Sequence, residues 1–251
     1  MMHNTWILNN CFYNGRFKGS AGRSETWWKN KNAKNNYHYK KMKLCNSLGV
    51  RLITIFEDEW LYRNAQVKQF LQATLGKFKR RIYARECKYV ETNNIKNFFS
   101  INHIQGSPQT INFGMALIYG DEIVGAVSYA RHHRNKDIIV LNRLAFKADI
   151  QIVGGASKLL TNSLKKVNCP IITWSDNRWS TGSIYEKCSF INDDELAPDY
   201  SYVIKQTRKS KQSMKKKNIN CPHGMTEHEF CLSKGIYRIY DCGKIRWKYN
   251  P

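Results

Sequence analysis

The stretch from about residue 112 to residue 205 constrains the fold most, because strand patterns and helical patterns alternate along it. Two apolar runs, 112–119 and 123–129, flank Gly120-Asp121-Glu122, which is typical of a hairpin turn. In the same stretch, three more strands are predicted at 138–146, 170–174 and 200–205, and two helices are predicted at 155–167 and 183–187. This order predicts an α/β (α+β) domain with a mixed sheet and flanking helices.

Residues 35–76 have the pattern of a second compact unit. A helix with an apolar stripe is predicted over 37–45, and it ends near Gly49. The β-branched run 50–56 predicts a strand that Glu57-Asp58-Glu59-Trp60 closes, and a helix is predicted at 64–75.

The chain is therefore predicted to have five regions. Residues 1–76 carry the compact unit just described, and residues 112–205 carry the α/β domain. Between them, 77–111 is predicted as a basic connector with a weak strand at 81–89. Residues 206–222 are predicted as a basic arm. Residues 223–251 are predicted as a small unit with a helix at 226–234 and a hairpin at 237–249.

Charge indicates the kind of partner. The 251 residues include 41 Lys and Arg against 19 Asp and Glu, so the formal net charge is +22. An excess of this size favours a polyanion, through phosphate contacts and the release of counterions. Since the basic residues are mixed with Trp, Tyr and Asn along the whole chain, a folded nucleic-acid binder is favoured over a basic tail, and double-stranded DNA is the expected partner. Ribosome-like or membrane-surface binding would give the same charge balance, and a merely solvated basic surface is the alternative. The sequence does not indicate an oligomeric state.

Apolar content and cysteine spacing indicate the compartment. A hydrophobic fraction of 42% excludes a disordered chain. No run approaches the roughly 18 apolar residues of a membrane-spanning helix, so no membrane association is predicted. The eight Cys residues include no C-x-x-C pair, which argues against a disulfide scaffold or a zinc ribbon and favours reduced thiols in a cytoplasm.

The residues predicted to contact DNA are basic or aromatic and lie in predicted loops and in the basic arm. Trp179, beside Arg178, has the side chain to stack on an extruded base, although a half-buried aromatic residue explains the pattern equally well. The remaining candidates, for which a merely solvated charge is the alternative, are Arg131, Arg134, Lys209, Lys211, Lys215, Lys216 and Lys217.

The acidic run after the predicted strand 50–56 is a candidate metal site. Glu57, Asp58 and Glu59 would present carboxylates at a sheet edge, where Asp58 and Glu59 would bind Mg²⁺. His38 would act as a proton shuttle beside them. Solvated carboxylates at a strand end are the alternative.

Residues 35–60 resemble phage free-standing homing endonucleases related to very-short-patch-repair nucleases, above all in Gly49-Val50-Arg51-Leu52-Ile53 and Glu57-Asp58-Glu59-Trp60. The resemblance implies a restriction-endonuclease-like nuclease unit, with His38, Glu57 and Asp58 as catalytic residues, acting in the cytoplasm of a phage-infected host cell. The upstream half departs from the family, because Arg23 stands where a His is expected and 7–13 contain no carboxylate. The nuclease unit is therefore predicted to be partial.

Gln151, Gly154, Gly155, Ala156 and Ser157 lie between a predicted strand and a predicted helix. Backbone amides at a glycine-rich helix start can bind a phosphate or pyrophosphate; an ordinary loop is the alternative. The pattern Gln-x-x-Gly-x-Ala is similar to the coenzyme A pyrophosphate loop of GCN5-related N-acetyltransferases, which implies acetyl-CoA or a related acyl-CoA as cofactor.

The segment after that helix extends the resemblance. Residues 184–190 look like the later motif of the same family, which implies Tyr185 as a general acid on the thiolate leaving group. Asp176 and Tyr185 also lie in a segment that resembles the phage Mom DNA-modification proteins, which implies that Asp176, with Asn177 and Arg178, holds a DNA base. Turn capping by Asp176 and core packing by Tyr185 are the alternatives.

Three functions remain open at this stage. The first is a DNA-binding relative of homing endonucleases with metal-dependent cleavage, since the endonuclease resemblance extends from 35 to 250. The second is an acyl-CoA-dependent transferase that modifies a DNA base. The third is a DNA-binding module without catalytic activity.

Overall fold

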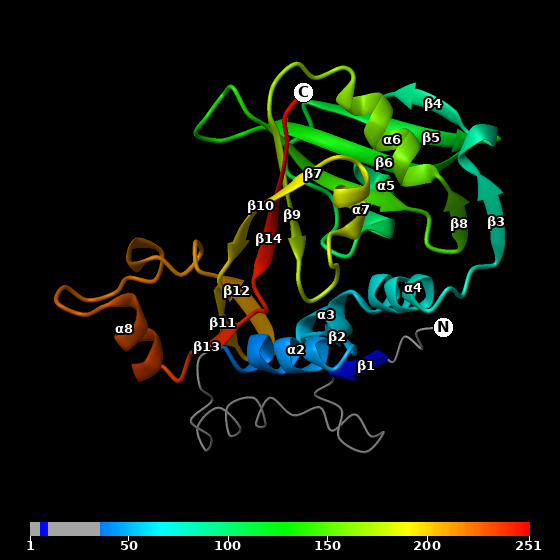
Figure 1. Ribbon diagram of the computed structural model, residues 1–251. Coiled ribbons are helices and arrows are strands. Elements are labelled where there is room, and N and C mark those ends of the chain that lie inside the picture. The colour runs from blue at the N-terminus through cyan, green and yellow to red at the C-terminus, as the bar shows by residue number, and fades with distance from the viewer. Residues whose placement is uncertain (1–5, 10–35) are drawn as a thin grey trace. The chain divides into compact units, whose positions relative to one another are not determined.

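The computed structural model describes the backbone of residues 6–9 and all of residues 36–251, which belong to two compact units (Figure 1). Unit 1 contains the described residues up to Tyr62 together with Asp176–Ser180 and Leu196–Lys244. Unit 2 contains Arg63–Ser175, Thr181–Glu195 and Ile245–Pro251. Arg23 and residues 10–13, on which the departure from the nuclease family rests, lie outside the described residues. The bounds of the five predicted regions stay a prediction, although several elements predicted within them differ from the structure.

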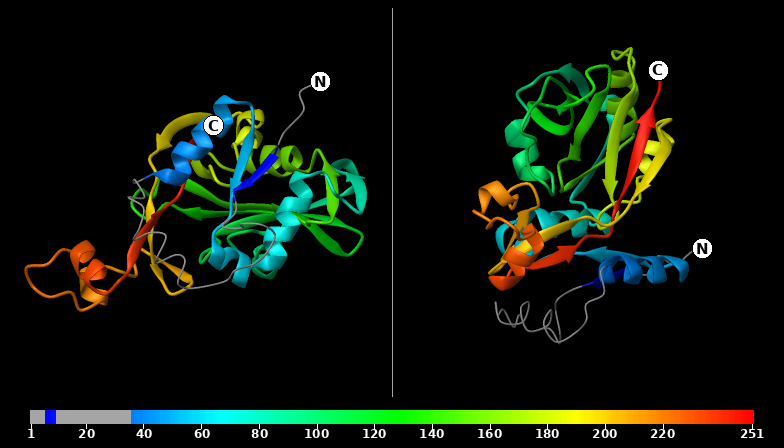
Figure 2. Two further views of the ribbon diagram at one scale, coloured as in Figure 1. Left: turned by 90° about the horizontal axis from the view of Figure 1, so that it is seen from below. Right: turned by 90° about the vertical axis from the view of Figure 1, so that its left-hand side faces the viewer.

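Unit 2 is built on a mixed seven-stranded sheet with the order β10-β14-β9-β7-β6-β5-β4. Strands β4 to β7 are antiparallel neighbours, and β7 is parallel to β9. The long strands β5, β6 and β7 run side by side in every view (Figure 2). The strand bounds are Lys88–Glu91 for β4, Phe113–Tyr119 for β5, Glu122–Arg131 for β6, Ile139–Phe146 for β7, Ile171–Asp176 for β9, Ile191–Leu196 for β10 and Lys244–Tyr249 for β14.

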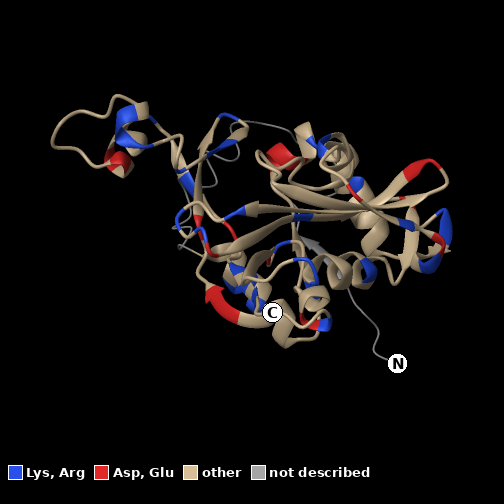
Figure 3. Cartoon of the chain, turned by 90° about the horizontal axis from the view of Figure 1, so that it is seen from above, with Lys and Arg blue, Asp and Glu red and all other residues tan. Residues whose placement is uncertain are grey.

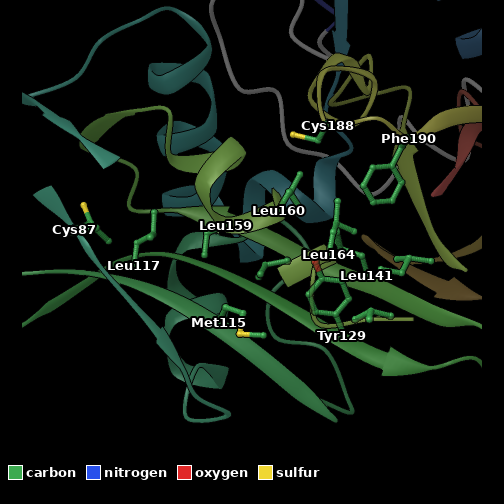
Figure 4. Packing of buried hydrophobic residues seen from close by; sticks show 14 of the residues in the cluster. Cys87, Met115, Leu117, Tyr129, Leu141, Leu159, Leu160, Leu164, Cys188 and Phe190 are labelled. Atoms are coloured by element: carbon green, nitrogen blue, oxygen red, sulfur yellow. The ribbon is translucent and has the colours of Figure 1, made fainter. Parts of the chain in front are cut away.

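Two helices cover opposite faces of this sheet. Because side chains alternate between the two faces along each strand, neighbouring residues of one strand pack with different helices. Met115 and Leu117 pack with Leu159 and Leu160 of α6 (Gly155–Leu164), as Figure 4 shows. Ala116, between them on β5, packs instead with residues of α5 (Lys96–Asn102). The predicted α/β fold with a mixed sheet and flanking helices is therefore confirmed, as is the hairpin of β5 and β6.

The predicted basic connector is part of unit 2 rather than a linker. Ile95 and Phe99 have no exposed surface, because they pack on the small residues of the sheet face opposite α6. The predicted strand at 81–89 is two strands, β3 (Arg80–Tyr83) and β4, separated by the 3-10 turn η1 (Ala84–Glu86). β3 pairs in parallel with β8 (Ile150–Val153), so the predicted loop at Gln151 is a strand. Unit 2 also contains α4 (Asn64–Thr74) and α7 (Ser183–Lys187).

In unit 1, α2 (Tyr37–Ser47) runs beside the parallel pair of β1 (Trp6–Asn9) and β2 (Arg51–Thr54) (Figure 1). Met42 of α2 packs on Leu52 of β2 and on Cys242. The acidic run does not close the strand as predicted, since it forms the first turn of α3 (Glu57–Tyr62). Carboxylates are favourable there because the helix N-terminus carries a partial positive charge, and Glu59 also accepts a hydrogen bond from the Phe56 N–H at 2.9 Å.

The second sheet of unit 1 has the order β12-β11-β13, with bounds Thr207–Ser210, Tyr200–Ile204 and Tyr237–Tyr240. The predicted basic arm therefore contains a paired strand, and its Met214 is buried against Tyr202 and Cys231. The predicted hairpin at 237–249 is wrong, because β13 pairs with β11 while β14 joins the sheet of unit 2. The last helical segments are η2 (Lys216–Asn218) and α8 (Glu227–Ser233).

None of the helices in the described part of the chain has the length and apolar character that crossing a bilayer requires.

One buried polar pair in the core of unit 2 gives a test of the packing. The Tyr129 hydroxyl on β6 lies 2.5 Å from Ser163 Oγ on α6, and Ser163 also donates to the Leu160 carbonyl. Ser163→Ala leaves the Tyr129 hydroxyl buried without this partner, so the free energy of unfolding should fall by about 1–3 kcal/mol. Removing both hydroxyls in Tyr129→Phe/Ser163→Ala should recover most of that loss in urea unfolding. A double variant no more stable than Ser163→Ala would contradict the assigned pair.

Candidate functional site

Strands β7 and β9 stop pairing soon after they meet. Their parallel register consists of two pairs, Ile139 with Ile171 and Val140 with Ile172. At the next position the Thr173 hydroxyl donates to the Leu141 carbonyl at 2.9 Å, in the place of a ladder hydrogen bond. Beyond Leu141, β7 continues to Phe146, and no strand among the described residues pairs with it on its β9 side.

The hydroxyl of Tyr185, the predicted general acid, lies at the point where the two strands part. It hydrogen-bonds the side chain of Thr173, and its ring packs against Phe190 and Trp247, at centroid distances of 5.7 and 6.1 Å. Burial raises the pKa of Tyr185, against the lowering effect of the Thr173 hydrogen bond and the Arg143 charge. The phenol is therefore protonated at neutral pH. Tyr185 thus has the proton that a general acid needs, and it also packs in the core, as the alternative interpretation predicted.

The glycine turn opens α6 as predicted. Gly154 caps the helix with φ +77°, a left-handed conformation that favours glycine. A Cβ on Gly155 would lie 2.9 Å from Phe146 and Ile152 side-chain atoms, so only glycine allows this approach. Gly154 and Ser157 are exposed, Ala156 is half-buried, and the first N–H groups of a helix have no partner within it. This helix start therefore suits an anion.

Basic side chains that the sequence reading did not assign border this turn. The Arg81 Nε donates to Gln151 Oε1 at 2.8 Å, so the predicted cofactor residue Gln151 is held by β3. Arg85 follows Ala84, whose Cβ would lie 3.7 Å from a Cβ on Gly154. Lys158 donates to the carbonyls of Ala84 and Cys87. The basic composition of the predicted connector was the sign of these side chains in the sequence. Their position could not be predicted from it, because the pairing of β3 with β8 joins segments far apart in the sequence.

The predicted nuclease residues of unit 1 form an ion-pair network instead of an open metal site. Arg178 donates to both Glu59 oxygens, at 2.9 and 3.0 Å, and to Asp176 Oδ2 at 2.9 Å. Arg208 donates to Asp58 Oδ1 at 2.7 Å and lies 2.9 Å from Glu59 Oε1. Burial alone would lower the pKa of Arg178, but the charges of Asp176 and Glu59 outweigh it and raise the pKa.

These ion pairs do not suit a magnesium ion. Both Glu59 oxygens, Asp58 Oδ1 and Asp176 Oδ2 already accept from guanidinium groups. A cation would have to displace two arginines whose charge it shares. Among the described residues no group of three His, Cys, Asp or Glu side chains has the arrangement of a metal site. These carboxylates therefore do not fit a magnesium ion.

The other predicted residues of this region are also placed. His38 lies edge-on to Phe56 at 5.4 Å between ring centroids, and burial, Arg178 and Lys41 lower its pKa to about 4. Burial and the Asp58 charge raise the pKa of Glu57. Trp179 is only 5% exposed and Arg178 6%, so the predicted stacking of Trp179 on a base and the predicted DNA contact of Arg178 do not agree with the structure.

The remaining predicted DNA contacts lie at the surface. Arg131 and Arg134 are exposed around the loop after β6, and Lys209, Lys215, Lys216 and Lys217 are exposed in unit 1. Lys211 is half-buried and forms an ion pair with Asp199 at 2.7 Å. Basic segments occur on helices, strands and loops of both units (Figure 3). Binding of DNA by these residues stays a prediction.

No protein-family model matches the chain, and no curated protein matches its sequence. Solved structures are similar at low identity. A Bacillus subtilis acetyltransferase in complex with CoA is 14% identical, with 66% of this chain and 99% of that chain covered and a TM-score of 0.40. A GNAT family acetyltransferase from Elizabethkingia anophelis with acetyl-CoA bound is also 14% identical, with 66% and 99% covered and a TM-score of 0.37. Arabidopsis thaliana Naa50, in complex with a bisubstrate analogue, is 16% identical, with 76% and 94% covered and a TM-score of 0.33. Likenesses at these TM-scores do not determine an activity.

The ion-pair network of unit 1 can be tested by its effect on stability. Arg178→Gln leaves Asp176 without its guanidinium partner and Glu59 with Arg208 alone, so the free energy of unfolding should fall by about 3–5 kcal/mol. Arg246→Gln removes an arginine that pairs with Asp193 at a more exposed site, and it should cost no more than about 1 kcal/mol. Equal losses for the two variants in urea unfolding would show that Arg178 has no special structural role.

Proposed function

We propose that this chain is an acyl-CoA-dependent transferase. The observation that carries the proposal is the course of β7 in unit 2. The strand begins to separate from β9 at Leu141, beside the Tyr185 hydroxyl, and its last residue, Phe146, lies under the glycine turn at Gly155. Five residues of strand span roughly 17 Å, so an anion site and a proton donor are joined by a stretch of β7 whose β9 side has no strand partner in the described part of the chain.

Each part of this arrangement has a role in the proposed reaction. The N–H groups at the start of α6 would bind the pyrophosphate of the donor, and Arg81, which holds Gln151, adds a basic side chain near this turn. The free side of β7 offers backbone groups to an extended, amide-containing arm, as a sheet edge does to a peptide. When bound, acyl-CoA supplies an activated thioester. Tyr185 would donate its proton to the sulfur as the carbon–sulfur bond breaks and the acyl carbon becomes bonded to a nucleophilic atom of the acceptor, which loses its own proton.

We further propose double-stranded DNA as the partner that carries the acceptor group. The net charge of +22 and the exposed Arg131, Arg134 and lysines of unit 1 support this proposal. Cleavage of DNA with Mg²⁺ is not part of it, because Asp58 and Glu59 are occupied by Arg178 and Arg208.

Binding of coenzyme A tests the anion site directly. Gly154→Asp places a carboxylate at the helix start, so the affinity for CoA in isothermal titration calorimetry should fall by at least about a hundredfold, because a negative charge replaces an open phosphate position. Gly120→Asp is the matched control, since Gly120 has φ +60° in the hairpin turn of the same unit. CoA binding that is unchanged in Gly154→Asp, or absent from the wild type, would refute the proposed cofactor site.

The role of Tyr185 is tested by separating binding from turnover. Tyr185→Phe removes the hydroxyl while Thr173 keeps its bond to the Leu141 carbonyl, so CoA affinity should stay near that of the wild type. Transfer from acetyl-CoA to DNA, measured as added mass on nucleosides, should fall by about 10²–10⁴-fold. Full transfer activity in Tyr185→Phe would restrict Tyr185 to core packing.

A further inference from the structure

Two arginines of unit 2, far apart in the sequence, converge on the loop that follows α5. Arg63, at the start of α4, donates from Nη1 to the Ile104 carbonyl at 3.2 Å. Arg143, on β7, donates from Nε to the Gly106 carbonyl at 3.0 Å and from Nη1 to the Asn142 carbonyl at 2.6 Å. Gly106 has φ +69°, and a Cβ there would lie 2.8 Å from Arg63 Nη1. Both guanidinium groups therefore lie against Gly106.

Neither arginine has an acidic partner within the described part of the chain. The hydrogen bonds of Arg63 and Arg143 there go to backbone carbonyls, and neither residue forms an ion pair with an Asp or Glu. By contrast, Arg178, Arg208 and Arg246 each pair with at least one carboxylate. The two half-buried charges of Arg63 and Arg143 therefore lie close together without compensation.

The electrostatics of the neighbouring groups agree with this geometry. Burial lowers the pKa of Arg143, and the Arg63 charge lowers it further. Burial, Arg143 and Arg63 lower the pKa of His103, on the same loop, to about 3. His103 is therefore neutral at physiological pH, and its Nδ1 accepts a hydrogen bond from the Gln105 N–H at 3.0 Å. Two like charges held this close are costly unless an anion joins them.

The pair is also close to the proposed reacting centre. Arg143 is two residues beyond Leu141, where Thr173 and Tyr185 meet, and its charge lowers the pKa of Tyr185. The glycine turn that would bind the donor lies beyond Phe146, at the other end of the same strand segment. The two positive sites are thus separate positions along β7.

We propose that Arg63 and Arg143 together bind a phosphate group of the acceptor substrate. Planar guanidinium groups match the oxygens of a phosphate, and the backbone carbonyls hold both groups in place before a ligand arrives. The Nη2 groups of both arginines have no partner among the described residues, so each has donors left for the anion. That the phosphate belongs to the acceptor rests on the proposed transferase function, whereas the anion site itself does not.

Titration of the full chain with inorganic phosphate tests the site, at constant ionic strength and with the ring signals of His103 followed by NMR. We expect phosphate to shift these signals in the wild type, in Arg246→Gln and in Gly154→Asp. Arg63→Gln and Arg143→Gln should each weaken this binding by at least about tenfold. If Arg143→Gln does not fold, Arg63→Gln decides, because Arg63 is tied to the loop by a single carbonyl bond.

Unchanged phosphate binding in Arg63→Gln, or loss of the His103 response in Gly154→Asp alone, would overturn the proposal. Displacement of phosphate by a short DNA duplex would support the site and place the phosphate in a nucleic-acid backbone, and displacement by adenosine monophosphate alone would support it with a mononucleotide. A chain that binds phosphate through both arginines but does not bind CoA would refute the cofactor proposal and leave the anion site standing.

Discussion

The early separation of β7 from β9 is the constraint on which the candidate site depends. A parallel pair in the middle of a sheet normally continues its ladder, because unpaired backbone groups in an interior are costly. Here Thr173 supplies a side-chain hydroxyl for the Leu141 carbonyl, and pairing stops. On its other side β7 is paired with β6 from Ile139 to Phe146, apart from a register shift at Asn142. The Tyr185 hydroxyl lies where β7 and β9 separate, because it hydrogen-bonds Thr173.

The arginines of this basic chain are used in two different ways. In unit 1, Arg178 and Arg208 are neutralised by Asp58, Glu59 and Asp176, so carboxylates that suggest a catalytic site by composition are engaged in ion pairs. Such a network adds little net stability over apolar packing, but removing one member leaves uncompensated charge. In unit 2, Arg63 and Arg143 are held only by carbonyls, which fix their position without neutralising them. Residue types alone do not separate these two cases.

Local patterns predicted the elements whose structure depends on local interactions. The hairpin of β5 and β6, the helix opened by Gly154 and the helix containing Tyr185 all follow from turn residues and periodicity. The errors concern pairing over long sequence distances, such as β3 with β8 and β14 in the sheet of unit 2. The sequence predicts a metal site at Asp58 and Glu59, because nothing in the spacing of these carboxylates shows that Arg178, 119 residues away from Glu59, forms an ion pair with Glu59. The Arg63–Arg143 pair was missed for the same reason.

The spacing along β7 makes the two proposed anion positions interdependent. Arg143 and Phe146, which lies under the glycine turn, are three residues apart, or roughly 10 Å along a strand. Between Arg143 and Phe146, β7 is paired with β6 without interruption, so this spacing changes little, and a donor phosphate and an acceptor phosphate would each be held at a fixed distance from the Tyr185 region. Repulsion between the two bound anions is reduced because each faces its own cationic group. Arg143, two residues before Ala145, contacts the loop after α5, whereas Phe146 packs on the α6 side, so the two proposed anion positions lie on opposite faces of the sheet.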